Sequence, residues 1–266
     1  MFIIGERING MFKAVARAIA ERDASVIAEL ARRQVAAGAQ ALDINTGPTE
    51  GDPVEVMRWL VETAQDAVDV PMSIDTPKLP VLESGLRAAR RPAIINSTTG
   101  AQDRLDALLP LAVEHGASLI GLTIDERGIP RNAEARAEIA LTIVAQAMAA
   151  GLPTERLFLD PIVLPVSAAQ DQSAAALEAV GLFRSLSEPP PRLIVGLSNV
   201  SQGTTHRSLV NRTYLVMAMA MGVDAAILDP NDRDLMDAVR TAGILLNHEI
   251  YAENYLESGA VTPVHA

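Results

Sequence analysis

Eight short apolar segments recur along this chain, and each is followed by a longer stretch with helical character. Their starts lie on the order of 30 residues apart, about the length of a strand, a crossover helix and two loops. The predicted strands span residues 2–6, 41–45, 71–75, 93–97, 118–123, 157–161, 192–198 and 225–229. Eight such units without a break in composition predict an α/β fold, a single closed (β/α)8 TIM barrel. An open doubly wound sheet is the alternative, but it usually has fewer strands.

Helical periodicity is clearest in five of the intervening stretches. They are residues 23–38, 52–69, 102–115, 133–150 and 231–246. Asp23 is a candidate N-cap for the first of them. Glycine occurs where four helices should end, and a left-handed C-terminal cap favours glycine. These residues are Gly38, Gly116, Gly151 and Gly222.

The chain has 266 residues, a length that α/β barrels routinely reach as one domain. Hydrophobic residues make up 49% and aromatic residues only 3%, so we expect an aliphatic core covered by Ala-rich helices. No low-complexity linker divides the sequence. We therefore predict one domain over residues 1–266, with an irregular tail from 252 to 266.

The formal net charge of −11 argues against nucleic-acid binding, because an acidic surface repels phosphate backbones. No apolar run approaches the roughly 18 to 20 residues that would cross a bilayer. Residues 1–6 carry no basic segment typical of a signal peptide. The absence of cysteine excludes disulfides, thiolate nucleophiles and thiolate-rich metal sites. We expect a cytoplasmic protein that contacts neither nucleic acid nor membrane.

Polar side chains occupy the C-terminal end of nearly every predicted strand. In a parallel barrel these ends share one face, where the active sites of such barrels lie. Each Asp or Asn taken singly has a structural explanation, because such side chains cap helices and satisfy loop amides. Their recurrence at one mouth instead indicates a binding site. The residues are Glu6, Asn9, Asp43, Asn45, Asp75, Asn96, Ser97, Asp125, Asp160, Ser198, Asn199 and Asp229.

A metal site at this mouth is not expected. None of the four histidines ends a predicted strand, and no H-E-x-x-H segment occurs. Mg²⁺ held by Asp carboxylates is the remaining metal alternative. The sequence also lacks the glycine-rich nucleotide-binding motifs and the G-x-S-x-G motif of hydrolases. Carboxylates and carboxamides together suit a flat heterocycle that is rich in N–H donors.

Six short segments carry a family resemblance: Gly5-Glu6-Arg7-Ile8-Asn9, Leu42-Asp43-Ile44-Asn45, Ser73-Ile74-Asp75-Thr76, Ile95-Asn96-Ser97, Asp160-Pro161 and Gly196-Leu197-Ser198-Asn199-Val200-Ser201. They resemble the pterin-binding barrel family, and most closely its methyltetrahydrofolate:corrinoid/iron–sulfur protein methyltransferase branch. The resemblance runs from about residue 1 to 250. Its most specific piece is a G-x-S-N-V-S segment, which also resembles the folate domain of cobalamin-dependent methionine synthase.

This resemblance implies that the mouth binds a reduced pterin. Asp75 and Asp160, when ionised, would accept the N–H donors of the pterin edge, and Asn96 would both donate and accept. Asn199 would hydrogen-bond to the pterin N5 during methyl transfer, with Asp43 beside the path of the proton. Arg207 would pair with the negative tail of the folate, or else lie on a solvated helix face. Further substrate contacts are expected from Asn9, Asn45, Gly196, Ser198 and Arg207.

The same resemblance implies that the N5 methyl group moves between 5-methyltetrahydrofolate and the cobalt of a corrinoid. None of the four histidines has the Asp-x-His-x-x-Gly setting of a corrinoid-binding module. A separate corrinoid or corrinoid/iron–sulfur protein is therefore expected to carry that group, and a homodimer is also implied.

Two alternatives remain open, a dihydropteroate synthase-like pterin enzyme and a non-catalytic folate-binding subunit. The synthase is expected to carry a lysine near strand 7 and a basic motif after strand 8. This chain has Gly-Leu-Ser-Asn at 196–199 and Leu-Asp-Pro-Asn at 228–231, which counts against pterin synthesis.

Overall fold

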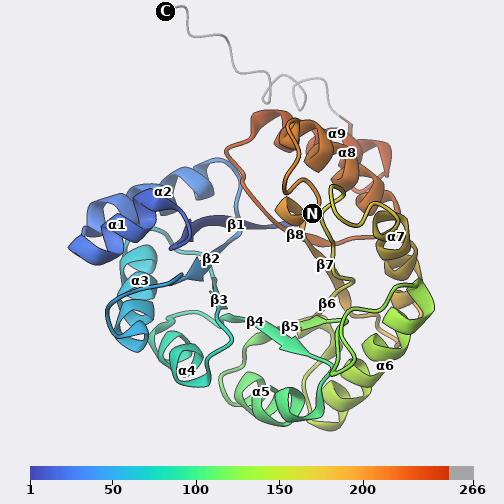
Figure 1. Cartoon of the computed structure of the whole chain (residues 1–266), viewed down its shortest axis with the longest axis horizontal. Coiled ribbons are helices and arrows are strands. Elements are labelled where there is room, and N and C mark those ends of the chain that lie inside the picture. The colour runs from blue at the N-terminus through green and yellow to red at the C-terminus, as the bar shows by residue number, and fades with distance from the viewer. Residues whose placement is uncertain (252–266) are drawn as a thin grey trace, which may run out of the picture.

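Eight parallel strands close into a barrel in the computed structural model of the protein, which describes residues 1–251 (Figure 1). The strands pair in chain order, and β8 pairs with β1 to complete the ring, while helices surround it (Figure 1). The predicted (β/α)8 barrel is confirmed, and the predicted tail from 252 to 266 lies outside the described residues. The strands are β1 Phe2–Asn9, β2 Ala41–Asn45, β3 Met72–Asp75, β4 Ile94–Thr99, β5 Ser118–Leu122, β6 Leu157–Asp160, β7 Arg192–Gly196 and β8 Ala225–Leu228.

The predicted strands differ from the structure mainly at their C-terminal ends. β1 continues to Asn9, because a bulge shifts its pairing with β2 between Gly5 and Ile8 and the pairing then resumes. β4 is likewise extended past an irregularity that follows Asn96. β7 ends two residues early at Gly196, because Leu197–Asn199 form a 3-10 turn. The backbone is therefore least regular at the mouth of the barrel, where bulges commonly re-aim side chains.

Within residues 1–251 nine α-helices accompany the strands, and all five predicted helices are among them. The Asp23 side chain accepts a hydrogen bond from the Ser25 amide, which confirms the predicted N-cap. The four glycines predicted to end helices all have positive φ. No helix among these residues is long and apolar enough to cross a membrane. The helices are α1 Lys13–Glu21, α2 Ala24–Ala36, α3 Pro53–Ala67, α4 Leu79–Ala88, α5 Gln102–Glu114, α6 Ala133–Ala149, α7 Gln172–Phe183, α8 Arg207–Ala220 and α9 Arg233–Leu245.

The buried side chains form two separate groups on the two faces of the strands. The larger group packs strand residues such as Ile3, Leu42 and Ile74 against the helices. The smaller group takes the alternate strand positions, so it fills the inside of the barrel. It consists of Ile4, Ala41, Ile94, Ile120, Phe158, Ile194 and Ala225.

Aromatic rings and one guanidinium group close the N-terminal end of the barrel. The ring centroids of Phe2 and Phe158 lie 6.2 Å apart. The Arg192 guanidinium lies 4.9 Å from the first centroid and 4.5 Å from the second. Both distances allow a cation–π interaction, which tolerates a partly buried cation. The inside of the barrel is therefore filled from this end upward.

The loops that follow β1 and β2 touch at the opposite end, through Gly10 and Gly47. A Cβ atom on Gly10 would lie 2.0 Å from the carbonyl oxygen of Thr46. A Cβ atom on Gly47, whose φ is +59°, would lie 2.5 Å from the carbonyl carbon of Gly10. Because backbone atoms cannot yield as a flexible side chain can, only glycine fits at this crossing.

We therefore expect Gly10→Ala to lower the free energy of unfolding by about 2 to 3 kcal/mol, the usual cost of forcing atoms into a packed region. Denaturant unfolding measures this change. Gly51→Ala is the matched control, because its Cβ would meet nothing closer than 3.8 Å. The control should change stability by less than about 0.5 kcal/mol. Equal effects of the two substitutions would contradict the close approach.

Candidate active site

The polar residues predicted at the strand ends lie directly above the apolar filling of the barrel. Side chains two residues apart on a strand share a face. Most of the group therefore face inward, because each follows a member of the apolar filling by two positions. Asp75 also faces inward, because it follows the outward-facing Ile74. We name this group the polar layer, and it comprises Glu6, Asp43, Asp75, Asn96 and Asp160.

Asp43 ties three neighbouring strands together within the polar layer. Its side chain is almost fully buried, and its Oδ1 accepts a hydrogen bond of 2.7 Å from the Ser73 hydroxyl. The Asn96 amide donates to the same oxygen at 3.1 Å. These bonds hold the Asn96 side chain with its carbonyl oxygen free to accept from a ligand.

Asp75 is held by the predicted site residue Asn45 of β2. The Asn45 side-chain amide donates to Asp75 Oδ2 at 2.6 Å, while Asn45 Oδ1 accepts from the backbone amide of Gly47 at 2.6 Å. The second bond fixes which end of the carboxamide faces Asp75. Asn45, at the end of its strand, therefore stabilises the following loop and orients Asp75 of the site at the same time.

Two buried carboxyl groups on adjacent strands cannot both ionise easily. Burial raises the pKa of Asp43 to about 8, and repulsion from Asp75 adds to the rise, against the hydrogen bonds from Ser73 and Asn96. Burial also raises the pKa of Asp75, against the hydrogen bond from Asn45. Near neutral pH the pair therefore retains a proton, and the layer can both donate and accept.

Asp160 sits across the barrel from this pair and is oriented by the backbone after it. The Ile162 amide donates to Asp160 Oδ1 at 2.7 Å. Ile162 has a φ of 65°, a left-handed conformation that β-branched residues rarely adopt. Burial raises the pKa of Asp160 to about 6, while the amides of Ile162 and Gly196 oppose the rise. At neutral pH Asp160 is therefore mainly an acceptor.

The 3-10 turn after β7 places Asn199 at the rim of the barrel. A Cβ atom on Gly196 would lie 3.1 Å from Asn199 Nδ2, so the glycine leaves room for this carboxamide. Among the described residues the carboxamide of Asn199 makes no hydrogen bond, and the residue is exposed. The amide is free to turn toward a ligand.

Glu6 and Arg207 both hold this turn through hydrogen bonds. The Ser198 hydroxyl donates to Glu6 Oε1 at 2.6 Å. The Arg207 guanidinium donates to the Ser198 carbonyl and to the Ser201 hydroxyl, both at 3.1 Å. Arg207 therefore supports the Asn199 turn although the residue is exposed, and its pairing with the folate tail stays a prediction.

Other predicted strand-end residues satisfy loop amides. Asn9 Oδ1 accepts from the Met11 amide at 2.9 Å. Asp229 Oδ1 accepts from the Asn231 amide at 3.0 Å, and its Oδ2 lies 3.5 Å from Arg7 Nε. The sequence assigned no specific role to two residues of the layer's network, Ser73 and Glu6, although Glu6 was expected among the polar residues of the mouth. Ser73 supports Asp43 and Glu6 pairs with Ser198, and both lie inside the segments that carry the family resemblance.

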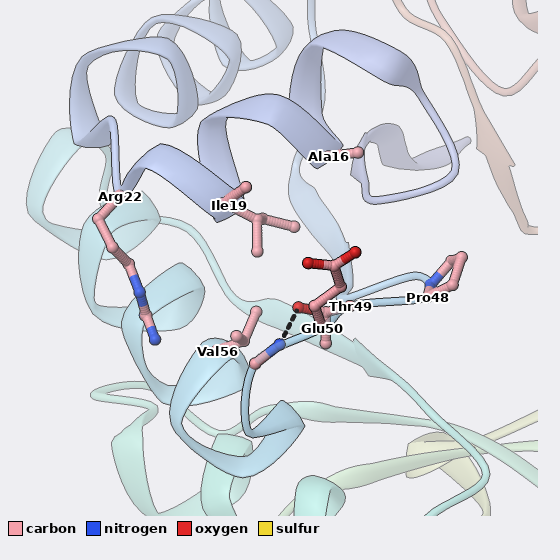
Figure 2. A pocket seen from close by; sticks show the side chains of 9 residues that line it. Ala16, Ile19, Arg22, Pro48, Thr49, Glu50 and Val56 are labelled. Carbon is pink, nitrogen blue, oxygen red and sulfur yellow. Dashed lines mark hydrogen bonds between the residues drawn. The ribbon is translucent and has the colours of Figure 1, made fainter.

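A pocket of about 520 Å³ lies outside the barrel, between α1 and the loop after β2 (Figure 2). Ala16 and Ile19 of α1 face Thr49 and Glu50 of that loop across it (Figure 2). No residue of the polar layer lines this pocket. Among residues 1–251, no three or more His, Asp or Glu side chains are arranged to hold a metal ion.

Residues 6–229 match the family described as pterin binding enzyme. This match covers most of the chain, including the whole polar layer. The chain belongs to the pterin-binding enzyme family.

Proteins of similar sequence support this family membership. A methylcorrinoid:tetrahydrofolate methyltransferase of Eubacterium limosum is 31% identical over 271 aligned residues, and both chains are covered completely. A methionine synthase of Mycobacterium leprae is 28% identical over 240 residues, which are 86% of this chain and 20% of that protein.

Solved structures of other pterin enzymes share the fold. A dihydropteroate synthase of Yersinia pestis with a pterine–sulfa conjugate superposes with a TM-score of 0.69, at 17% identity, over 93% of this chain and 94% of that one. The dihydropteroate synthase of Thermus thermophilus gives 0.65 at 20% identity, over 94% of each chain. At these identities the likeness concerns the barrel alone.

The buried carboxyl pair makes the stability of this pterin-binding enzyme depend on pH. Because the pKa of Asp43 rises to about 8 on folding, the native state binds more protons than the unfolded state between about pH 4 and 8. The free energy of unfolding should therefore fall as pH rises through this range. Asp43→Asn should remove on the order of 1 to 3 kcal/mol of that fall between about pH 5 and pH 8.

Denaturant unfolding across this pH range checks the sign and the size of the effect. Asp103→Asn, which removes an exposed carboxylate of α5, is the control and should follow the unmodified protein. Parallel pH curves for Asp43→Asn and the unmodified protein would show that Asp43 is ionised throughout.

Proposed function

We propose that this chain transfers the N5 methyl group between 5-methyltetrahydrofolate and the cobalt of a corrinoid carried by a separate protein. The observation that carries the proposal is the polar layer, with acceptors at its base and a free carboxamide, Asn199, at its rim. The full-length similarity to a methylcorrinoid:tetrahydrofolate methyltransferase supports the choice of reaction.

The polar layer suits the donor-rich edge of a reduced pterin. That edge presents an exocyclic amine and a ring N–H side by side, and a carboxylate can accept two such bonds at once. Asp160 and Asp75 are the proposed acceptors. Asn96 offers its free carbonyl oxygen, because its amide is already engaged with Asp43. A ring without matching donors would leave buried acceptors unpaired, at a cost of about 1 to 3 kcal/mol for each.

The chemical step is difficult because an amide anion is a poor leaving group. When the methyl group departs from N5, the electron pair of the broken bond stays on nitrogen. A hydrogen bond to N5 that strengthens as this pair develops lowers the barrier. Asn199 is the proposed donor, since its carboxamide is unengaged and the missing Cβ of Gly196 gives it room.

The methyl acceptor must reach the rim from outside. We propose that a corrinoid or corrinoid/iron–sulfur protein docks over the mouth, where its reduced cobalt supplies the nucleophile. Asp43 and Asn45 lie within the layer, in hydrogen bonds to Ser73 and Asp75, and orient the groups that face the pterin. Asn9, Gly196, Ser198 and Arg207 shape and support the rim around it.

Substitutions in the two parts of the site should separate binding from catalysis. Asp75→Ala and Asp160→Ala should weaken binding of 5-methyltetrahydrofolate by about 10- to 100-fold, the usual loss of a charge-assisted hydrogen bond. Asn199→Ala should slow methyl transfer by about 100- to 1000-fold with little change in binding. Asn231→Ala, an exposed Asn on the loop after β8, is the control and should leave both unchanged.

Calorimetry measures the binding, and the visible absorbance of cob(I)alamin under anaerobic conditions measures the transfer. Equal losses of binding and rate in Asn199→Ala would refute its proposed role. Binding without any methylation of cobalamin would favour a non-catalytic folate-binding subunit. Consumption of a dihydropterin pyrophosphate with p-aminobenzoate would instead identify a dihydropteroate synthase.

We also propose that the chain forms a homodimer through α8 and its surroundings. Leu209, Met217 and Met221 are exposed apolar residues at helical spacing, beside a pocket of about 480 Å³ between α7 and α8. Met217→Glu should convert the dimer to a monomer in light scattering after gel filtration, because it places a charge in an apolar contact. Met148→Glu on the exposed face of α6 is the control. A dimer that survives Met217→Glu would move the interface elsewhere.

A further inference from the structure

Glu6 is a carboxyl group of the polar layer to which the function proposed above assigns no role. It lies on β1 at the C-terminal end of the barrel, in the two-residue bulge where Glu6 and Arg7 stand opposite Asp43 alone. Two residues earlier on the same face, Ile4 is fully buried in the filling of the barrel. Glu6 therefore projects inward, at the level of Asp43.

The bulge that aims Glu6 is built into the packing of α2 against β1. Gln34 of α2 is fully buried, and its Oε1 accepts a hydrogen bond of 2.8 Å from the Arg7 amide. A Cβ atom on Gly5 would lie 2.5 Å from that same oxygen. The glycine thus admits the Gln34 side chain, and the glutamine satisfies an amide that the bulge removes from the strand ladder.

Glu6 is linked directly to the turn that carries Asn199. β8 lies between β1 and β7 in the ring (Figure 1). The 2.6 Å hydrogen bond between Ser198 Oγ and Glu6 Oε1 therefore spans the end of β8 and joins two strands that do not pair. A hydroxyl group both donates and accepts, so this contact can pass a proton in either direction.

Burial and a neighbouring carboxylate favour the protonated form of Glu6 by raising its pKa. Burial raises its pKa, and the nearby Asp229 adds to the rise, while the hydrogen bond from Ser198 and the charges of Arg7 and Arg207 act in the opposite sense. Asp43, on the neighbouring strand, is the other carboxyl group that interacts with it.

We propose that Glu6 holds the proton that the pterin N5 takes up, and that Ser198 relays this proton from Glu6 to the Asn199 turn. The inference rests on the proposed methyl transfer and names a proton source for it. Glu6 does not touch the pterin itself, and it acts through Ser198 by holding the proton in position. Asn199 remains the group that hydrogen-bonds to N5.

Methyl transfer breaks one bond at N5, forms one bond at cobalt and adds one proton to N5. The bond between N5 and the methyl carbon breaks and leaves its electron pair on N5. The methyl carbon forms its new bond with the electron pair that cobalt(I) supplies. N5 takes the hydroxyl proton of Ser198, and Ser198 takes the proton of Glu6. Glu6 is left ionised and regains a proton from solvent after the product leaves.

Glu6→Gln tests the proposal, because the amide keeps the shape and the hydrogen bond to Ser198 but releases no proton. We expect methyl transfer to cob(I)alamin to slow by about 100-fold or more, the usual contribution of a positioned acid. Binding of 5-methyltetrahydrofolate, measured by calorimetry, should change by less than about three-fold, under 1 kcal/mol. A rate within three-fold of the unmodified enzyme, or a loss of binding as large as the loss of rate, would overturn the proposal.

Asp229→Asn provides a second test that does not alter Glu6 itself. In the unmodified enzyme the transfer rate should fall as pH rises through the raised pKa of Glu6, because the ionised carboxyl has no proton to give. Removing the Asp229 charge lowers that pKa, so this fall should move to lower pH. Asp229 is not among the groups that shift the pKa of Asp43, so a titration of Asp43 would not move in this way.

An unmoved pH profile in Asp229→Asn would refute the role of Glu6 even if Glu6→Gln failed to fold. The unmodified enzyme separates this outcome from a failure of the proposed function. If it transfers no methyl group to cobalamin at any pH, both proposals fall together. If it transfers the methyl group and the two variants behave like it, only the proton role of Glu6 is lost.

Discussion

The barrel concentrates buried carboxyl groups in one layer, and the rest of the site depends on how the free-energy cost of burying those charges is offset. Charged groups lose their hydration when they are buried, and like charges repel strongly where the dielectric is low. Here the compensation comes mainly from neutral donors, such as the Ser73 hydroxyl and the side-chain amides of Asn45 and Asn96. Neutral donors offset part of the cost without cancelling the negative potential. The layer therefore remains attractive to a neutral ligand that brings N–H groups of its own.

The same compensation explains why the site works as a unit. Asn45 of β2 donates to Asp75 of the adjacent β3, and Asn96 of β4 donates across β3 to Asp43 of β2, so an amide from another strand orients each carboxyl group. These hydrogen bonds between strands hold the side chains in place before any ligand arrives. A preorganised acceptor set loses less rotational freedom on binding than flexible side chains would. The rim differs, because Asn199 stands free there while only its backbone turn is held.

The regular parts of the barrel could be predicted from sequence, because apolar strand segments and Ala-rich helices alternate with a steady period. All eight strands and five of the helices lie within a few residues of their predicted ranges. Helix α8 was harder to foresee, because exposed apolar residues such as Val216 and Met217 blur its periodicity. The ends of β1 and β7 were misjudged for another reason. A bulge and a 3-10 turn depend on contacts with distant residues, such as Gln34, that no local pattern contains.

The site was predictable to a similar degree. Strand-end position marks Asp43, Asp75, Asn96 and Asp160, because the chain direction of parallel strands puts them on one face. Their partners are less visible in the sequence, since the bond from Ser198 to Glu6 joins residues 192 positions apart. Arg207 shows the same limit, because its contacts with the turn follow from how α8 begins, which periodicity does not define.

The contact of Arg192 with two phenylalanine rings has a consequence for the order of binding and release. These side chains close the N-terminal end of the barrel, so the polar layer is approached from the C-terminal end. A pterin bound to these carboxyl groups would enter and leave through the mouth of the barrel. A corrinoid protein docked over the mouth, as proposed above, would block that route. Under the proposed function, binding and release would then be ordered. The folate substrate would bind before the corrinoid protein docks, and the folate product would leave only after the corrinoid protein has dissociated.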